Sequence, residues 1–172
     1  MAVIYLVTQQ EIVKNTPMGG NVDFDKYKSL INDVQDLILE PILGTKLYDK
    51  ILADFDGGSL AGDYQTMFDD YIKQVMWHSV FSQFAQLGSL IVRNGGMYKH
   101  TSGDSELASE SEVNSLVKAY QSKADAYIER LERFLCDKNI TEYDNAQDEE
   151  YDIDPKRNLR TIGGLYFGNA QD

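Results

Sequence analysis

Apolar residues recur every three or four positions over four stretches of the chain, which is the spacing of helices that bury one face. The stretches are residues 24–38, 47–55, 67–91 and 113–135. From Trp77 onward, apolar residues of the third stretch cover a wider arc, which places this part at the centre of the fold. The pattern therefore predicts an all-α protein, built as a bundle of about four helices.

Capping residues and a proline set the expected helix ends. Thr8 followed by Glu11, and Ser109 followed by Glu112, form capping boxes, in which side chain and backbone at a helix start bond reciprocally. They predict a short helix that starts after Thr8 and runs to residue 13, and the start of the last long helix. Pro41 is expected to end the first long helix, because the residue before a proline disfavours helical backbone.

The apolar faces of these helices define the expected core. Leu37 and Ile38 fall on the same face as the rest of the first helix, and His78 is expected to be a hydrogen-bonded core or interface residue. The predicted core residues are Leu30, Ile31, Val34, Leu47, Ile51, Phe68, Ile72, Trp77, Phe81, Phe84, Leu116, Tyr120, Tyr127 and Leu131.

Three segments lie outside the helical pattern. Residues 3–7 are apolar and fit either an extended N-terminal arm or an edge strand, and residues 93–101 suggest a small hairpin. After Cys136 an acidic run leads to the cationic residues 156–160 and then to the apolar, glycine-bearing residues 162–168. We therefore divide the chain into a helical domain (residues 1–136), where the core patterns end, and an acidic linker with an extended C-terminal docking tail (residues 137–172).

Both parts are acidic. Of the net charge of −12, residues 1–136 contribute −7 (12 Lys/Arg against 19 Asp/Glu) and residues 137–172 contribute −5 (4 against 9). Tight binding to phosphates needs clustered cations, and no stripe of Lys and Arg is present, so we expect no sequence-specific nucleic-acid binding. An acidic surface is compatible with DNA that slides past without sticking.

The sequence offers no arrangement for catalysis. His78 has no Cys, Asp or Glu three or four residues further on, and neither Gly57-Gly58 nor Gly95-Gly96 has the Gly-Lys-Ser/Thr ending of a phosphate loop. We predict no catalytic residue, no metal and no cofactor, and therefore a protein that is not an enzyme. The lone Cys136 suits synthesis in a reducing cytoplasm. No stretch resembles a signal peptide or a membrane span, so no membrane is expected.

Four stretches of the chain resemble small head–tail connector (adaptor) proteins of tailed bacteriophages, particularly phages of Bacteroidota such as the crAss-like group. They are LEPILGTKLYDKIL at residues 39–52, LAGDY at residues 60–64, IVRNGGM at residues 91–97 and RLERFLC at residues 130–136. The order matches over most of residues 8–172. The longer start at residues 2–7 and the Asn94-Gly95-Gly96 form of the turn are departures from the family, and the first leaves the role of the N-terminal arm open.

This resemblance implies a structural virion protein of the neck, made in the host cytoplasm, that assembles as a ring (usually of twelve copies) beneath the portal. Its partners would be further copies of itself, the portal protein, an adjacent neck or tail protein, and double-stranded DNA that passes without sequence-specific binding. In such connectors the C-terminal segment reaches an adjacent protein, by strand addition or by insertion of aromatic side chains. Here the corresponding residues are Leu159, Arg160, Ile162, Leu165, Tyr166 and Phe167.

Two other functions remain open at this point. One is a tail-completion or stopper protein one layer further out in the neck. The other is a soluble helical regulatory or binding module with an acidic tail. An assembly subunit forms rings or binds a portal, whereas a regulator stays a monomer or dimer and binds one soluble partner.

Overall fold

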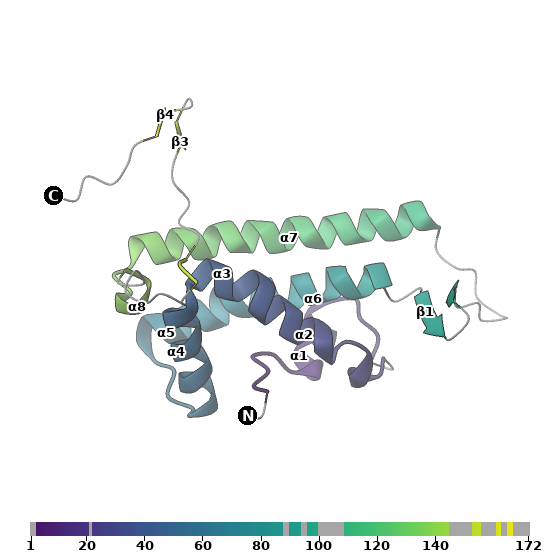
Figure 1. Cartoon of the computed structure of the whole chain (residues 1–172), viewed down its shortest axis with the longest axis horizontal. Helices are drawn as coiled ribbons and strands as arrows, with labels where there is room; N and C mark the ends of the chain where they lie inside the picture. Colours follow the sequence, from purple (N-terminus) through teal and green to yellow (C-terminus); the bar gives the residue numbers. More distant parts are fainter. Residues whose placement is uncertain are drawn as a thin grey trace.

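A computed structural model describes residues 3–20, 22–87, 90–93, 96–99, 109–144, 153–155, 161–162 and 165–166. Helices build most of the core, so the prediction of an all-α fold is confirmed (Figure 1). The helical elements are α1 (Gln9–Asn15), η1 (Phe24–Lys26), α2 (Lys28–Val34), η2 (Gln35–Leu39), α3 (Glu40–Leu43), α4 (Thr45–Asp56), α5 (Gly62–Met67), η3 (Phe68–Ile72), α6 (Lys73–Leu87), α7 (Glu110–Asp137) and α8 (Thr141–Asp144).

Two antiparallel hairpins complete the described elements: β1 (Leu90–Arg93) with β2 (Gly96–Lys99), and β3 (Thr161–Ile162) with β4 (Leu165–Tyr166). The first hairpin replaces the end of the long third helix that the periodicity predicted through residue 91, since α6 ends at Leu87. It also starts three residues before the expected range of 93–101.

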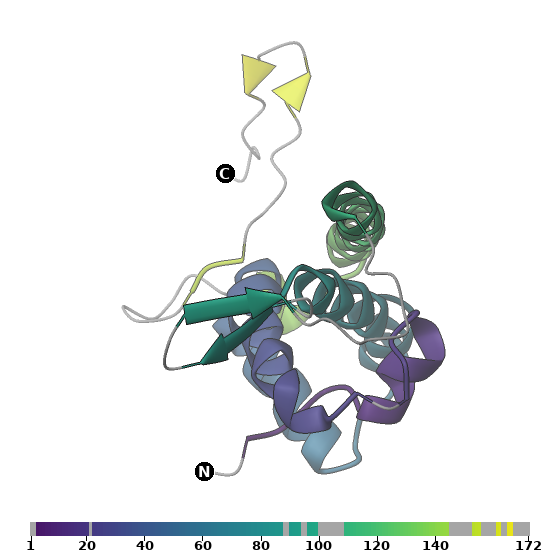
Figure 2. The ribbon, with the colours of Figure 1, turned by 90° about the vertical axis from the view of Figure 1, so that its right-hand side faces the viewer.

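Helix α6 lies at the centre, as predicted. Eight consecutive residues of α6, from Val75 to Ser82, are buried, because α7 packs along one side of α6 while α1 and α2 pack on the other (Figures 1 and 2). Both capping boxes form: the Thr8 and Ser109 hydroxyls accept backbone N–H bonds from Glu11 and Glu112, whose carboxylates bond back. The short helices α1 and α8 add to the longer segments, so a simple four-helix bundle does not describe the whole arrangement.

A π turn changes the phase of the first long helix. In η2 the Glu40 N–H donates to the Gln35 carbonyl, five residues back, and the extra residue rotates the subsequent turn relative to a regular α-helix. Leu37 consequently points outward and is 72% exposed, although the periodicity places it on the apolar face. The π turn also brings Pro41 into the first turn of α3, where a missing N–H is tolerated. Pro41 therefore does not end the helix, which continues to Leu43.

Most predicted core positions are buried. The buried ones are Leu30, Ile31, Val34, Leu47, Ile51, Phe68, Ile72, Trp77, Phe81 and Leu131. Phe84 and Tyr120 are half-buried and pack against the core, and Tyr127 is half-buried against His78. Leu116 was predicted wrongly: it is 40% exposed, because the next residue of α7, Val117, occupies the buried position.

The N-terminal segment is part of the core. Leu6 and Val7 are fully buried, and the side chain of Gln35 binds the backbone of this segment at two points. The Leu6 N–H donates to Gln35 Oε1 (2.9 Å), and Gln35 Nε2 donates to the Ile4 carbonyl (3.0 Å). Residues 3–7 therefore form no edge strand, and the expected N-terminal arm packs onto the core at its inner end, since a buried side-chain amide supplies the hydrogen bonds that a neighbouring strand would supply.

The core continues beyond the expected end at Cys136. Ile140, just before α8, and Tyr143, within α8, are buried in the main core cluster. Around them, the Tyr64 hydroxyl donates to Glu142 Oε2 (2.5 Å), and burial together with Glu142 raises the pKa of Tyr64 to about 12. The prediction that the core patterns end by residue 136 is therefore wrong, because two isolated apolar residues are too few to produce a periodic pattern.

A second contact fixes the chain further on, at residues 153–155. The Thr45 N–H donates to the Ile153 carbonyl and the Ile153 N–H donates to Thr45 Oγ1, both at 3.0 Å. Gly44, at φ +77°, makes room for this segment, since a Cβ there would lie 2.7 Å from Cδ of Pro155. The acidic part of the C-terminal region is thus held to the body at α8 and at Ile153, and the remaining 17 residues (156–172) continue from one fixed point.

Candidate docking groove

A groove with a volume of about 430 Å³ lies between α7 on one side and η2 and α3 on the other, with α6 beneath. Its lining residues are Leu37, Ile38 and Ile42 from η2 and α3, Ser79, Ser82, Gln83 and Gln86 from α6, and Val117, Gln121, Ala124, Asp125, Ile128 and Glu132 from α7. The π turn of η2 positions one wall, because it turns Leu37 away from the core and toward this surface.

The walls of the groove are mainly apolar. Leu37, Ile38 and Ile42 line one side, and Val117, Ala124 and Ile128 line the other; of these six, Ile42, Val117 and Ala124 are buried. An exposed leucine beside further apolar side chains favours contact with another apolar surface, because covering it removes apolar area from water.

The floor of the groove is polar. Ser79 and Ser82 are buried, and the Ser82 hydroxyl donates to the Ser79 carbonyl at 3.0 Å. The amides of Gln83 and Gln86 on α6 and of Gln121 on α7 each carry donors and an acceptor, so they can bond the backbone of a peptide laid along the groove.

The charge of the groove has one sign. Its lining contains two carboxylates, Asp125 and Glu132 of α7, and no Lys or Arg. They are seven residues apart, and therefore about 10 Å along the helix axis.

His78 lies near the groove, between α6 and α7. Its ring is 5.6 Å, between centroids, from both Tyr120 and Tyr127. Burial, and then the charge of Lys123, lower the pKa of His78. Contrary to the expected hydrogen bond, its buried Nδ1 has no partner. Among the residues that the structure describes, no group of three His, Cys, Asp or Glu side chains could hold a metal ion.

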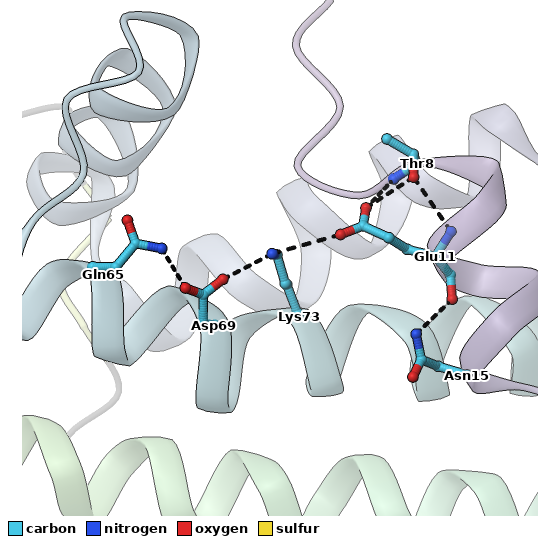
Figure 3. A network of polar contacts seen from close by, with 6 residues as sticks. All are labelled: Thr8, Glu11, Asn15, Gln65, Asp69 and Lys73. Atoms are coloured by element: carbon cyan, nitrogen blue, oxygen red, sulfur yellow. Dashed lines mark hydrogen bonds and ion pairs between the residues drawn. The ribbon is translucent and has the colours of Figure 1, made fainter.

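A second polar cluster joins α1 to η3 and α6 (Figure 3). Lys73 Nζ lies 2.7 Å from Asp69 Oδ1 and 3.5 Å from Glu11 Oε1, and Gln65 donates to the other Asp69 oxygen. Burial opposes ionisation of Asp69, but Lys73 and Gln65 outweigh it and lower its pKa. Burial likewise lowers the pKa of Lys73, but Asp69 and Glu11 together outweigh burial and raise it. Both groups therefore stay charged near neutral pH, and the cluster holds α1 in place.

The predicted docking tail is described only in part. Ile162 lies in β3, and Leu165 and Tyr166 lie in β4, with Ile162 paired to Leu165. Leu159, Arg160 and Phe167 lie outside the described residues. Gly163-Gly164 between Thr161-Ile162 and Leu165-Tyr166 is a two-residue hairpin signal that the interpretation as an extended tail missed. Strands β3 and β4 stand away from the helices in both views (Figures 1 and 2), so they do not fill the groove of their own chain.

Within the described part of the chain, each helix lacks the length or the continuous apolar character that a membrane span requires.

Comparison with known proteins assigns the chain to a protein family. No curated protein and no solved structure matches the sequence. One family model matches residues 39–153, about two thirds of the chain, which include α3 to α8 and the contact at Ile153. The chain therefore belongs to the family of unknown function DUF6712.

Proposed function

We propose that this protein is a structural subunit of a bacteriophage neck: a ring-forming head–tail adaptor that docks on the portal, extends the DNA channel and offers an attachment surface to the tail or the next ring. It acts in the virion and has no enzymatic activity. The resemblance of residues 39–52, 60–64, 91–97 and 130–136 to phage connectors motivates the proposal.

The observation that carries the proposal is that the C-terminal segment is attached to the helical body at residues 153–155. Thr45 and Ile153 exchange two backbone-directed hydrogen bonds, and Gly44 leaves space for Pro155. The described core uses nothing beyond this point, yet residues 159–167 are rich in apolar and aromatic side chains. A segment of this composition that leaves a rigid body from a defined position suits contact with an adjacent protein.

The connector-like run LEPILGTKLYDKIL also contains residues that hold the C-terminal segment against the body. Pro41, Gly44 and Thr45 belong to it, and together they form the joint between α3 and α4 against which residues 153–155 pack. The resemblance therefore covers the residues that set the origin of the tail.

The charge of the chain supports the proposed passage of DNA. With a net charge of −12 the protein repels phosphates, so DNA moves along an acidic ring without sticking to it. Binding to DNA that depended on sequence would require cationic clusters instead.

The proposal is tested by mixing the protein with the portal ring encoded in the same genome, followed by size-exclusion chromatography. The full chain should elute with the portal, and a chain that ends at Pro155 should not, although its far-UV circular dichroism is unchanged. Equal binding of both chains would exclude the tail as the docking element. Absence of binding by either chain would favour a stopper one layer further out or a soluble regulatory module.

A further inference from the structure

We propose that the first half of α7, residues 110–127, opens from α6 in mildly acidic solution, and that a proton on His78 triggers the opening. This opening is a property of the isolated chain and does not depend on the proposed function. Two features of the structure support it: the enclosure of His78, and the unequal attachment of the two halves of α7 to the core.

His78 is enclosed where α7 packs on α6. The residue is 7% exposed, and its ring centroid lies 5.6 Å from those of Tyr120 and Tyr127 on α7. Its Nδ1 is buried and has no hydrogen-bond partner. In the protonated imidazole both ring nitrogens are donors, so a proton leaves a buried N–H without an acceptor and adds a charge away from water. The closed state therefore disfavours the charged form.

The cations around His78 act in the same direction. Lys123 Nζ lies 4.1 Å from the ring centroid of Tyr120, and the guanidinium carbon of Arg130 lies 5.2 Å from that of Tyr127. A tyrosine ring attracts a cation to its face, but both rings already hold one, so they compensate an imidazolium poorly. Burial, and then the charge of Lys123, lower the pKa of His78.

Neighbouring carboxylates do not offset these cations. Asp125 lines the groove, and Glu129 pairs with Arg133 at 3.2 Å. From η3, the neutral ring of Tyr71 lies 5.7 Å from the guanidinium carbon of Arg130. In the part of the chain that the structure describes, none of the ion pairs includes the imidazole. The neutral imidazole is therefore the form that fits the closed contact.

The two halves of α7 are held unequally. In the second half, Leu131 and Leu135 are fully buried in the main core cluster, and this half ends beside α8 (Figure 1). In the first half the buried residues are Val117 and Ala124, and both lie outside that cluster. The half-buried rings that enclose His78 complete the contact of this half. A penalty at His78 therefore acts on the part of α7 that opens at the lower cost.

The direction of the pH effect follows from proton linkage. Opening returns His78 to water, where its ordinary pKa is 6.5, so the open state takes up a proton at a higher pH than the closed state. The equilibrium constant for opening consequently rises as the pH falls below 6.5. It levels off once the pH is below the pKa of the closed state. At pH 5 the rise is at most about 30-fold, the value reached if the imidazole stays neutral while α7 is closed.

The test is hydrogen exchange of the full chain, measured by mass spectrometry between pH 7.5 and pH 5. Protection factors remove the intrinsic pH dependence of amide exchange. Helical stability in proteins comes mostly from tertiary packing, so a detached half of α7 loses protection. We expect protection over residues 110–127 to fall several-fold, and by up to about 30-fold, while residues 131–135 keep theirs. Constant protection of the first half, or equal losses in both halves, would overturn the inference.

Three variants make the test specific. His78→Phe keeps a flat ring in the contact but cannot take up a proton, so protection over residues 110–127 should no longer change with pH. Lys123→Gln removes an exposed cation and brings the pKa of His78 closer to 6.5, which should weaken the pH effect. Lys118→Gln is the matched control, because Lys118 is also exposed but lies about 140° away around the helix. A pH effect of wild-type size in His78→Phe would overturn the inference.

An NMR titration of the wild-type chain gives a second readout that needs no folded variant. The chain has two histidines, His78 and His100, and the His78 signal should titrate below pH 6.5. A His78 signal that titrates at or above this value would also overturn the inference. Neither measurement involves the portal, so failure of this inference and failure of the proposed function are separate results.

Discussion

Gly44 provides the sharpest test of how the C-terminal segment is fixed. Its backbone lies at φ +77° and ψ 152°, a region that residues with a Cβ rarely adopt, and forcing alanine into it costs about 1–3 kcal/mol. A Cβ would also lie 2.7 Å from Cδ of Pro155 and 3.2 Å from the carbonyl oxygen of Ile153. Because these atoms belong to a segment held by two hydrogen bonds, Gly44→Ala should release the segment.

The expected loss results from both effects. Each of the two hydrogen bonds between Thr45 and Ile153 contributes about 0.5–1.5 kcal/mol. Added to the backbone cost, their loss lowers the free energy of unfolding by about 2–6 kcal/mol in total. Urea denaturation monitored by far-UV circular dichroism measures this change. Hydrogen exchange of the Thr45 and Ile153 amides shows whether the segment has left the body.

Gly58 is the matched control. It also has a positive φ, of +63°, but a Cβ there would meet no atom within 4 Å. Gly58→Ala should therefore show the backbone cost of about 1 kcal/mol and leave the Thr45 and Ile153 amides protected. Equal losses for the two variants, with equal protection of these amides, would refute the view that residues 153–155 pack against Gly44.

Three further predictions concern the stability of the body. Deletion of residues 156–172 should leave the melting temperature nearly unchanged in circular dichroism, whereas deletion from residue 137 onward should cost at least about 4 kcal/mol, because it removes two buried side chains at α8. Trp77→Ala and Phe81→Ala should each lower the free energy of unfolding by about 3–5 kcal/mol in urea titrations, and a change near zero would place this face in a contact between subunits. The pKa of Asp69 is lower in the folded than in the unfolded chain, so its contribution is present above the unfolded value of 3.8 and disappears as the pH falls through the folded value. Wild type should thus exceed Asp69→Asn by less than about 1 kcal/mol at pH 7, since the Asp69 side chain is 42% exposed. The two should converge as the pH falls below the folded pKa of Asp69, and a difference that persists in acid would contradict this ion pair as its source.

Local patterns predicted the elements that depend on neighbours in sequence. The capping boxes at Thr8 and Ser109 and the helical periodicity each involve residues within one or two turns. Both capping boxes form, and the predicted helices appear, apart from the end of the third stretch beyond Leu87. The same reasoning identified α6 as central, because an apolar arc too wide for one interface requires neighbours on more than one side.

Features set by distant contacts were not predictable in this way. The π turn of η2 shifts Leu37 outward, and no composition rule places such a turn. Gln35 binds the N-terminal backbone 31 and 29 residues away, and a buried glutamine has the same appearance in a sequence as an exposed one.

The candidate site was likewise predictable only where it depends on residues that are close in sequence. The cationic and apolar character of the tail is visible in the sequence, but the groove depends on how four helical elements meet, and its two carboxylates on α7 look like any solvated helix face. The fixed exit at Pro155 depends on Thr45, which lies more than 100 residues earlier in the chain.

Cryo-electron microscopy of the full chain mixed with the portal ring of the same genome tests the adaptor function most directly. We predict a ring of this chain at the narrow end of the portal, with residues 156–167 ordered against a neighbouring protein and an acidic wall around the channel. A chain that stays a lone monomer beside the portal at all concentrations and salt conditions would contradict the adaptor function.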